Sequence, residues 1–126
     1  MNLSDMVARP SRAKHIAEWA VKLEDVFGCE VIDNQGQVLA RANRGLNLSS
    51  DWKGIDGVLP GVVWGVVARV ESAFGKAELV VVDYENMKIV GFTLFKGEFG
   101  LIVAASRSSD PYSLKKRVLE SFDPTN

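Results

Sequence analysis

The chain contains a single cysteine, Cys29, and a single histidine, His15. One cysteine cannot form a disulfide within the chain, and its place in an apolar run favours a buried structural thiol. One histidine and one cysteine without a spaced cluster of carboxylates form no recognisable zinc, calcium or iron site. We therefore expect His15 at the surface or at a packing seam, and we expect no metal or other cofactor.

The sequence also lacks the motifs by which enzymes bind nucleotides or transfer groups. It has no phosphate-binding loop of the Gly-Lys-Ser/Thr type and no glycine fingerprint that opens a helix after a strand. No nucleophile can be paired with a base, which disfavours a small hydrolase. We expect a protein that is not an enzyme.

Charge of one sign and long apolar runs are also missing. Lys and Arg number 15 and Asp and Glu number 16, for a formal net charge of -1, so there is no basic stripe for nucleic acid and no polybasic patch for a membrane. No segment reaches about 18 consecutive apolar residues, and residues 1–9 lack the apolar stretch of a secretory signal. We expect one cytoplasmic domain over residues 1–126, with flexible ends at 1–10 and 123–126, and a protein partner.

The hydrophobic pattern that is present predicts an α+β sandwich with the order helix, two strands, helix, three strands, helix. Apolar residues at helical spacing predict helices over 12–27, 59–74 and 111–122. Alternating and β-branched runs predict strands at 29–32, 37–42, 77–84, 88–95 and 99–105. A tight turn at 33–36 makes the first two strands a hairpin. Asp110 is the expected N-cap of the last helix.

The predicted helix 59–74 is apolar all round. One side carries a stripe of valines for the sheet, and the other carries Gly61, Trp64, Gly65, Ala68 and Ser72. Small residues one turn apart let another backbone approach closely, with Trp64 as a large anchor. Because a two-layer domain covers only one side, we expect a second chain on the other. The alternatives are a poor helix with an exposed back or, given the β-branched valines, a strand.

Two further features leave alternatives open. The predicted strand 77–84 has three valines in a row and few of the charges that protect an exposed edge, so we expect it to pair with a second copy of itself. Lys115, Lys116 and Arg117 form either a basic patch for an acidic partner or the solvated face of the last helix. The loop 106–110 is either an anion site or a polar loop that ends in an N-cap.

Two stretches resemble the roadblock / dynein light-chain family. Residues 31–40, Val-Ile-Asp-Asn-Gln-Gly-Gln-Val-Leu-Ala, match its first hairpin, and residues 90–104 look like its fourth and fifth strands around a glycine turn. The resemblance covers roughly residues 13–122. The connection 43–58, with Trp52, looks longer than in the family.

The resemblance implies a five-stranded antiparallel sheet between helices, and homodimers or heterodimers built through the second helix and third strand. It also implies regulation or scaffolding of small Ras-like GTPases, whose GTP hydrolysis some bacterial relatives accelerate. The implied dimer interface falls on Gly61, Trp64, Gly65, Ala68, Ser72, Glu78, Val80 and Val82.

The alternative function is a small-molecule sensor of the PAS or profilin-like type, in which the sheet and the central helix enclose a ligand. Such a sensor needs a roomy, partly polar pocket. The inward positions of the predicted strands are valine, leucine and phenylalanine, which offer no group to orient a ligand.

Overall fold

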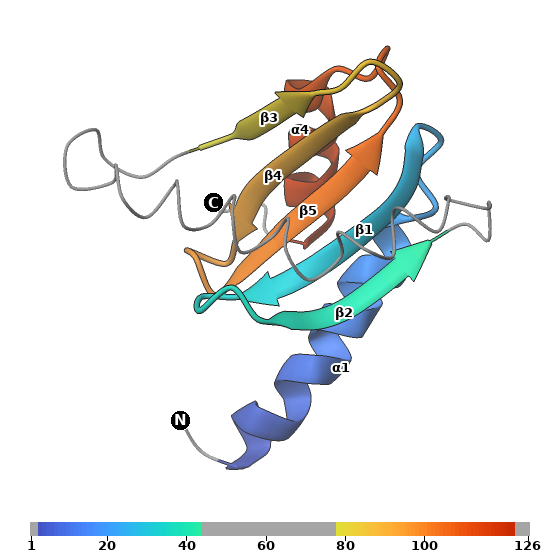
Figure 1. The fold of residues 1–126 in the computed structure, drawn as a ribbon. Helices are drawn as coiled ribbons and strands as arrows, with labels where there is room; N and C mark the ends of the chain where they lie inside the picture. Colours follow the sequence, from blue (N-terminus) through green and yellow to red (C-terminus); the bar gives the residue numbers. More distant parts are fainter. Residues whose placement is uncertain (1–2, 44–77, 123–126) are drawn as a thin grey trace, which may run out of the picture.

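The computed structural model of the protein describes residues 3–43 and 78–122. The described helices and strands follow one another in the predicted order, and Figure 1 shows their arrangement. In chain order they are α1 (Leu3–Ala20), β1 (Val26–Asp33), β2 (Val38–Asn43), β3 (Val80–Asp83), β4 (Lys88–Leu94), β5 (Phe99–Ala105) and α4 (Pro111–Phe122). The predicted helix 59–74 and most of the connection 43–58 lie outside the described residues.

The five strands form one sheet in the order β2-β1-β5-β4-β3, and every neighbouring pair is antiparallel. The two longest ladders join β5 to β1 and to β4, so β5 is the centre of the sheet. All seven residues of β5 are buried. Helices α1 and α4 lie over the same face of the sheet, with α1 against β1 and β2 and α4 against β4 (Figure 1). The predicted five-stranded antiparallel sheet is confirmed.

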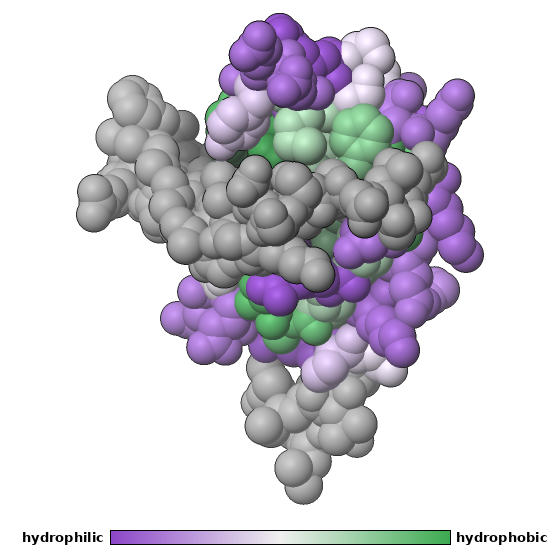
Figure 2. Space-filling view, turned by 45° about the vertical axis from the view of Figure 1, so that its right-hand side comes forward, coloured by the Kyte–Doolittle hydropathy of each residue, from purple (hydrophilic) through white to green (hydrophobic). Residues whose placement is uncertain are grey.

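Apolar side chains are buried on both faces of the sheet. The larger cluster lies between the sheet and the helices, where α1 contributes Ile16 and α4 contributes Leu114 and Val118. A smaller cluster on the opposite face comprises Ile32, Ile89, Ile102 and Ala104, with Val38, Val82 and Met87 packed against it. Figure 2 shows small hydrophobic patches between hydrophilic side chains on one side of the molecule.

The first hairpin is closed by a carboxylate. Asp33 Oδ1 accepts hydrogen bonds from the backbone N–H of Gln35 at 2.8 Å and of Gln37 at 2.9 Å. Gly36 has φ 83°, a conformation in which a Cβ is disfavoured. The tight turn predicted at 33–36 is therefore confirmed. Asp33 and Gly36 have the roles in it that make Asp and Gly common in turns.

The bounds predicted for the first helix are wrong at both ends. The helix begins at Leu3 and contains Pro10, so residues 3–10, which the sequence placed in a flexible end, are helical. The chain turns after Ala20, and Val26, the first residue of β1, pairs with Ala105 of β5. Val26 continues the apolar spacing of the helix, but a strand next to the sheet centre buries it as well. Neither described helix has the length and apolar character needed to cross a membrane.

Candidate interaction surface at the sheet edge

Strand β3 forms one edge of the sheet. Within the described residues its only partner is β4, with Val80 opposite Gly91 and Val82 opposite Ile89. The backbone groups on its outer side face away from the sheet, and the strand itself carries three valines before its first charge, Asp83. Edge strands are usually protected by charges, by proline or by a bulge. β3 is therefore the edge strand that the sequence predicted, although it is shorter than 77–84.

The side chains of β3 alternate between the two faces. Val80 and Val82 are half-buried, and Val82 packs on the smaller cluster beside Ile89. Val81 pairs with Val90, which belongs to the helix-side cluster, and it is 38% exposed. The implied interface residues Val80 and Val82 therefore share one face of an accessible edge.

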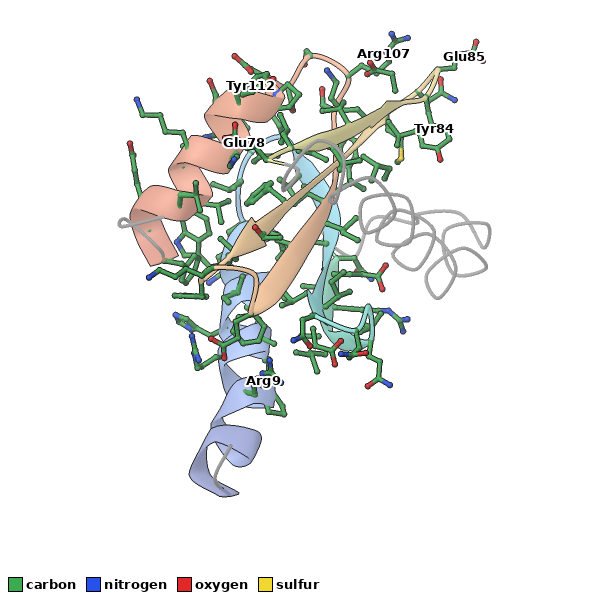
Figure 3. The ribbon with its side chains drawn as sticks, turned by 90° about the vertical axis from the view of Figure 1, so that its left-hand side faces the viewer. Arg9, Glu78, Tyr84, Glu85, Arg107 and Tyr112 are labelled. Atoms are coloured by element: carbon green, nitrogen blue, oxygen red, sulfur yellow. The ribbon has the colours of Figure 1, made fainter. Side chains whose placement is uncertain are left out.

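The two ends of β3 are anchored by cations. Lys115 of α4 donates from Nζ to the backbone carbonyl of Glu78 at 2.8 Å, and Figure 3 shows Glu78 beside that helix. At the other end, Arg107 donates from Nη1 to the carbonyl of Glu85 at 3.1 Å, and Lys88 Nζ lies 3.8 Å from Asp83 Oδ1. These contacts hold β3 at both ends, and among the described residues only β4 pairs with its middle.

The three cations of α4 do not form a single patch. Lys115 is half-buried against Glu78, whereas Lys116 lies 4.0 Å from Glu120 one turn away and Arg117 is exposed. Lys115 therefore has a structural contact within the fold. Lys116 and Arg117 stay candidates for contact with an acidic partner.

The loop before α4 uses its own donors. Asp110 Oδ1 accepts from the backbone N–H of Tyr112 at 3.0 Å and of Ser113 at 3.4 Å, which confirms the predicted N-cap. The N–H of Ser108 donates to Ser106 Oγ at 3.2 Å, and the N–H of Ser109 donates to the carbonyl of Ser106 at 3.0 Å. With these donors engaged, the arrangement favours the polar loop over an anion site.

Neither Cys29 nor His15 sits in a reactive arrangement. Cys29 is buried, and its thiol donates to the carbonyl of Ala17 at 3.3 Å; burial raises the pKa of this thiol to about 12. The predicted buried structural thiol is confirmed. His15 is exposed and meets the edge of the Phe122 ring at 5.9 Å between centroids. Across the described ranges, no three His, Cys, Asp or Glu side chains gather as metal ligands.

The sequence alone did not reveal an ion pair in which the carboxylate is buried and the arginine is half exposed. Glu30 of β1 is 3% exposed, and its Oε2 lies 2.9 Å from Nε of Arg41 on β2. The two residues are cross-strand partners in the first hairpin. The sequence does show opposite charges on two adjacent predicted strands. Which of these residues face each other can be predicted only once the register of the strands is known.

Comparison with known proteins gives structural but no sequence matches. A scan against protein-family models and a search among curated proteins each find none. Among solved structures, the gliding protein MglB from Thermus thermophilus superposes with a TM-score of 0.72 at 17% identity, covering 93% of this chain and 90% of that one. An MglB with a tetrameric arrangement gives 0.70 at 16% identity, covering 93% and 89%.

A Roadblock/LC7 domain from Streptomyces avermitilis is similar as well. Its TM-score is 0.64 at 17% identity, with 88% of this chain and 94% of that one covered. The five-stranded antiparallel sheet agrees with the architecture that the resemblance implied, and both described helices lie on one face of it. At these identities the likeness establishes the architecture, and the chain has the roadblock fold.

Proposed function

We propose that the chain is a non-enzymatic, dimeric regulator or scaffold that binds a small Ras-like GTPase. The observation that carries the proposal is the roadblock fold with an accessible edge at β3, where three consecutive valines carry no charge. Roadblock domains pair with one another and bind such GTPases, as the sequence resemblance implies. The tetrameric arrangement of one similar MglB supports self-association of this fold.

Self-association through β3 has a simple physical basis. Two copies of the strand, antiparallel about a two-fold axis, continue the sheet from one chain into the next. The N–H and C=O groups on the outer side of each β3, which no described strand pairs, then become hydrogen-bonded, and Val81 becomes less exposed. The helix half of the interface, with Gly61, Trp64, Gly65, Ala68 and Ser72, is inferred from the sequence.

The dimer is tested by solution mass. Light scattering on the wild type should give a mass near twice 13.8 kDa. Val81→Lys should shift the protein towards the monomer, because each chain then brings a positive charge to the edge that pairs with its copy. Asn34→Lys adds the same charge at the exposed turn between β1 and β2, and it should leave the dimer intact. A monomeric wild type would contradict the dimer.

Modulation of GTP hydrolysis, if exerted, would act by reshaping the partner's own site. An arginine finger would have to be free to reach the partner, but Arg41 contacts Glu30 and Arg107 contacts the carbonyl of Glu85. Neither is a free arginine finger.

The partner is tested by capture. The tagged protein, added to an extract of its source cells supplied with GDP or with a non-hydrolysable GTP analogue, should retain a small GTPase detectable by mass spectrometry. Val81→Lys tests whether capture needs the dimer. Recovery of no GTPase in either nucleotide state would refute this part of the proposal.

A further inference from the structure

A groove lies on the helix side of the molecule, where α1, the β4–β5 turn and the end of α4 meet. Its volume is about 320 Å³, and it is lined by Ser11, Arg12, His15, Ile16, Phe95 and Phe122. None of these residues belongs to β3 or to the implied dimer interface. Its walls are largely aromatic and aliphatic, which suits a large apolar side chain.

The turn that forms one wall of the groove adopts a costly backbone conformation. Phe95 has φ 54° and Lys96 has φ 56°, both in the left-handed region. The turn comprises residues 95–98, between the paired Leu94 and Phe99, and left-handed positions in turns are usually occupied by Gly or Asn, because a Cβ is disfavoured there. A bulky aromatic residue at such a position is a true outlier, and local strain of this kind concentrates at functional sites.

The strained turn places an aromatic ring against an arginine. The Arg12 guanidinium lies 4.8 Å from the centroid of the Phe95 ring and 5.1 Å from that of Phe99, and the two rings meet edge to face at 5.9 Å. Cation–π contacts with two rings hold the Arg12 head group at the wall of the groove. The unfavourable backbone conformation of Phe95 therefore accompanies the position in which its ring contacts Arg12.

The rim of the groove has an excess of positive charge. Arg9 Nε lies 3.6 Å and Arg12 Nη1 lies 3.1 Å from the same oxygen, Glu98 Oε1, so two cations share one carboxylate. Figure 3 shows Arg9 on α1 near this end of the sheet. Lys96 is exposed in the same turn as Glu98. A ligand with negative charge beside its apolar part is electrostatically complementary to this rim.

We propose that the groove binds one bulky apolar side chain flanked by carboxylates, presented by a segment of a protein partner. The apolar side chain packs against Ile16, Phe95 and Phe122, and the flanking carboxylates pair with Arg12 and Lys96. The groove is open along the surface, so the partner's backbone stays outside while one side chain enters. This binding uses no residue of the β3 edge, and it does not depend on the proposed dimer or on GTPase binding.

The test uses the full chain, labelled with ¹⁵N, and short dye-labelled synthetic peptides with a central phenylalanine between glutamates. The phenylalanine peptide should shift the amide signals of Arg12, Ile16 and Lys96 of the protein. Its binding, followed by fluorescence polarisation, should be saturable. Peptides with lysines in place of the glutamates, or with a central alanine, should bind at least about tenfold more weakly. Added salt should weaken the binding of the first peptide.

Two variants separate binding from folding. Phe95→Asn removes the ring but places a residue that tolerates the left-handed conformation, so the turn should persist while affinity falls about tenfold. Arg12→Ala should weaken binding to a similar degree, whereas Lys14→Ala, a lysine paired with Glu18 on the same helix, should not. Amide spectra verify that each variant is folded.

Three results would overturn the proposal. One is equal binding of all the peptides, and another is unchanged affinity in a folded Phe95→Asn variant. The third is that phenylacetate alone shifts the same amides and saturates at a lower concentration than the acidic peptide. This last result would assign the groove to a small aromatic acid instead of a protein segment.

Discussion

Replacing Lys96 by glycine should stabilise the protein, whereas the same replacement at Lys116 should destabilise it. Both lysines are exposed, so lost packing contributes little at either site. They differ in backbone conformation, since Lys96 has φ 56° in the β4–β5 turn and Lys116 lies inside α4. The pair therefore isolates the energetic effect of the backbone.

The magnitudes follow from known backbone costs. A residue with a Cβ in the left-handed region loses about 1–2 kcal/mol, and glycine regains this but costs about 0.5–1 kcal/mol through the entropy of the unfolded chain. Lys96→Gly should therefore gain roughly 0.5–1 kcal/mol. Inside a helix, Lys116→Gly should lose about 1 kcal/mol, plus a few tenths from its ion pair with Glu120.

Urea unfolding followed by circular dichroism measures both changes as shifts of the midpoint. All variants must be compared at one protein concentration, because association would add to the apparent stability. Gly97→Ala is a further control: its Cβ meets nothing within 4 Å, yet φ 91° makes it unfavourable, so stability should fall without a clash. If Lys96→Gly lowers stability as much as Lys116→Gly does, the argument from backbone strain is refuted.

Three further predictions concern the cap and the thiol. Asp110→Ala should lower the free energy of unfolding by about 1 kcal/mol, and Asp110→Asn should lower it much less, because only the alanine variant loses the acceptor for the N–H groups of α4; urea midpoints distinguish the two. The Cys29 thiol should resist a thiol reagent at pH 8 until urea unfolds the chain, since burial raises its pKa to about 12 from 9.0. Below pH 9 both states keep this proton, whereas between pH 9 and about 12 the unfolded state releases it, so the wild type should lose stability over this range more steeply than Cys29→Ala. Fast labelling of the folded protein would contradict the buried thiol.

The sequence predicted best the elements whose signals are local. β5 occupies the predicted range 99–105, and α4 the predicted range 111–122. A capping aspartate, a proline in the first turn, and a run of β-branched residues each act within a few residues. The first hairpin was predictable for the same reason, because Asp33 and Gly36 determine its turn.

The end of α1 was not predictable in this way. The apolar residues of the helix recur at helical spacing up to Val26, through Ile16, Trp19, Ala20 and Leu23. Only the pairing of Val26 with Ala105 in the sheet shows that the helix has ended before Val26. These two residues are far apart in the sequence, so no local pattern contains the information. At the other end the predicted start at residue 12 comes just after Pro10, but proline disfavours a helix interior without strictly preventing it, and the helix runs through it.

The same difference between local and distant contacts applies to the candidate surfaces. The open edge at β3 was foreseen, because three consecutive valines without a charge are visible in the sequence. The contacts of Glu30 with Arg41, and of Arg12 with Glu98, depend on register and on the docking of α1 against a distant turn. The register of the first hairpin even shifts between Val31 and Ile32, so spacing alone misplaces its partners.

The separation of the two surfaces has a consequence for assembly. Because the groove shares no residue with β3, pairing through β3 leaves the lining residues of each groove free of the edge contact. A dimer then presents two identical grooves related by a two-fold axis. A partner with two acidic, apolar segments gains affinity from the second contact only if its linker spans both grooves, so its binding should depend on linker length and should fall to that of a single segment in Val81→Lys. A two-segment peptide that shows no such dependence would mean that the two surfaces do not act together.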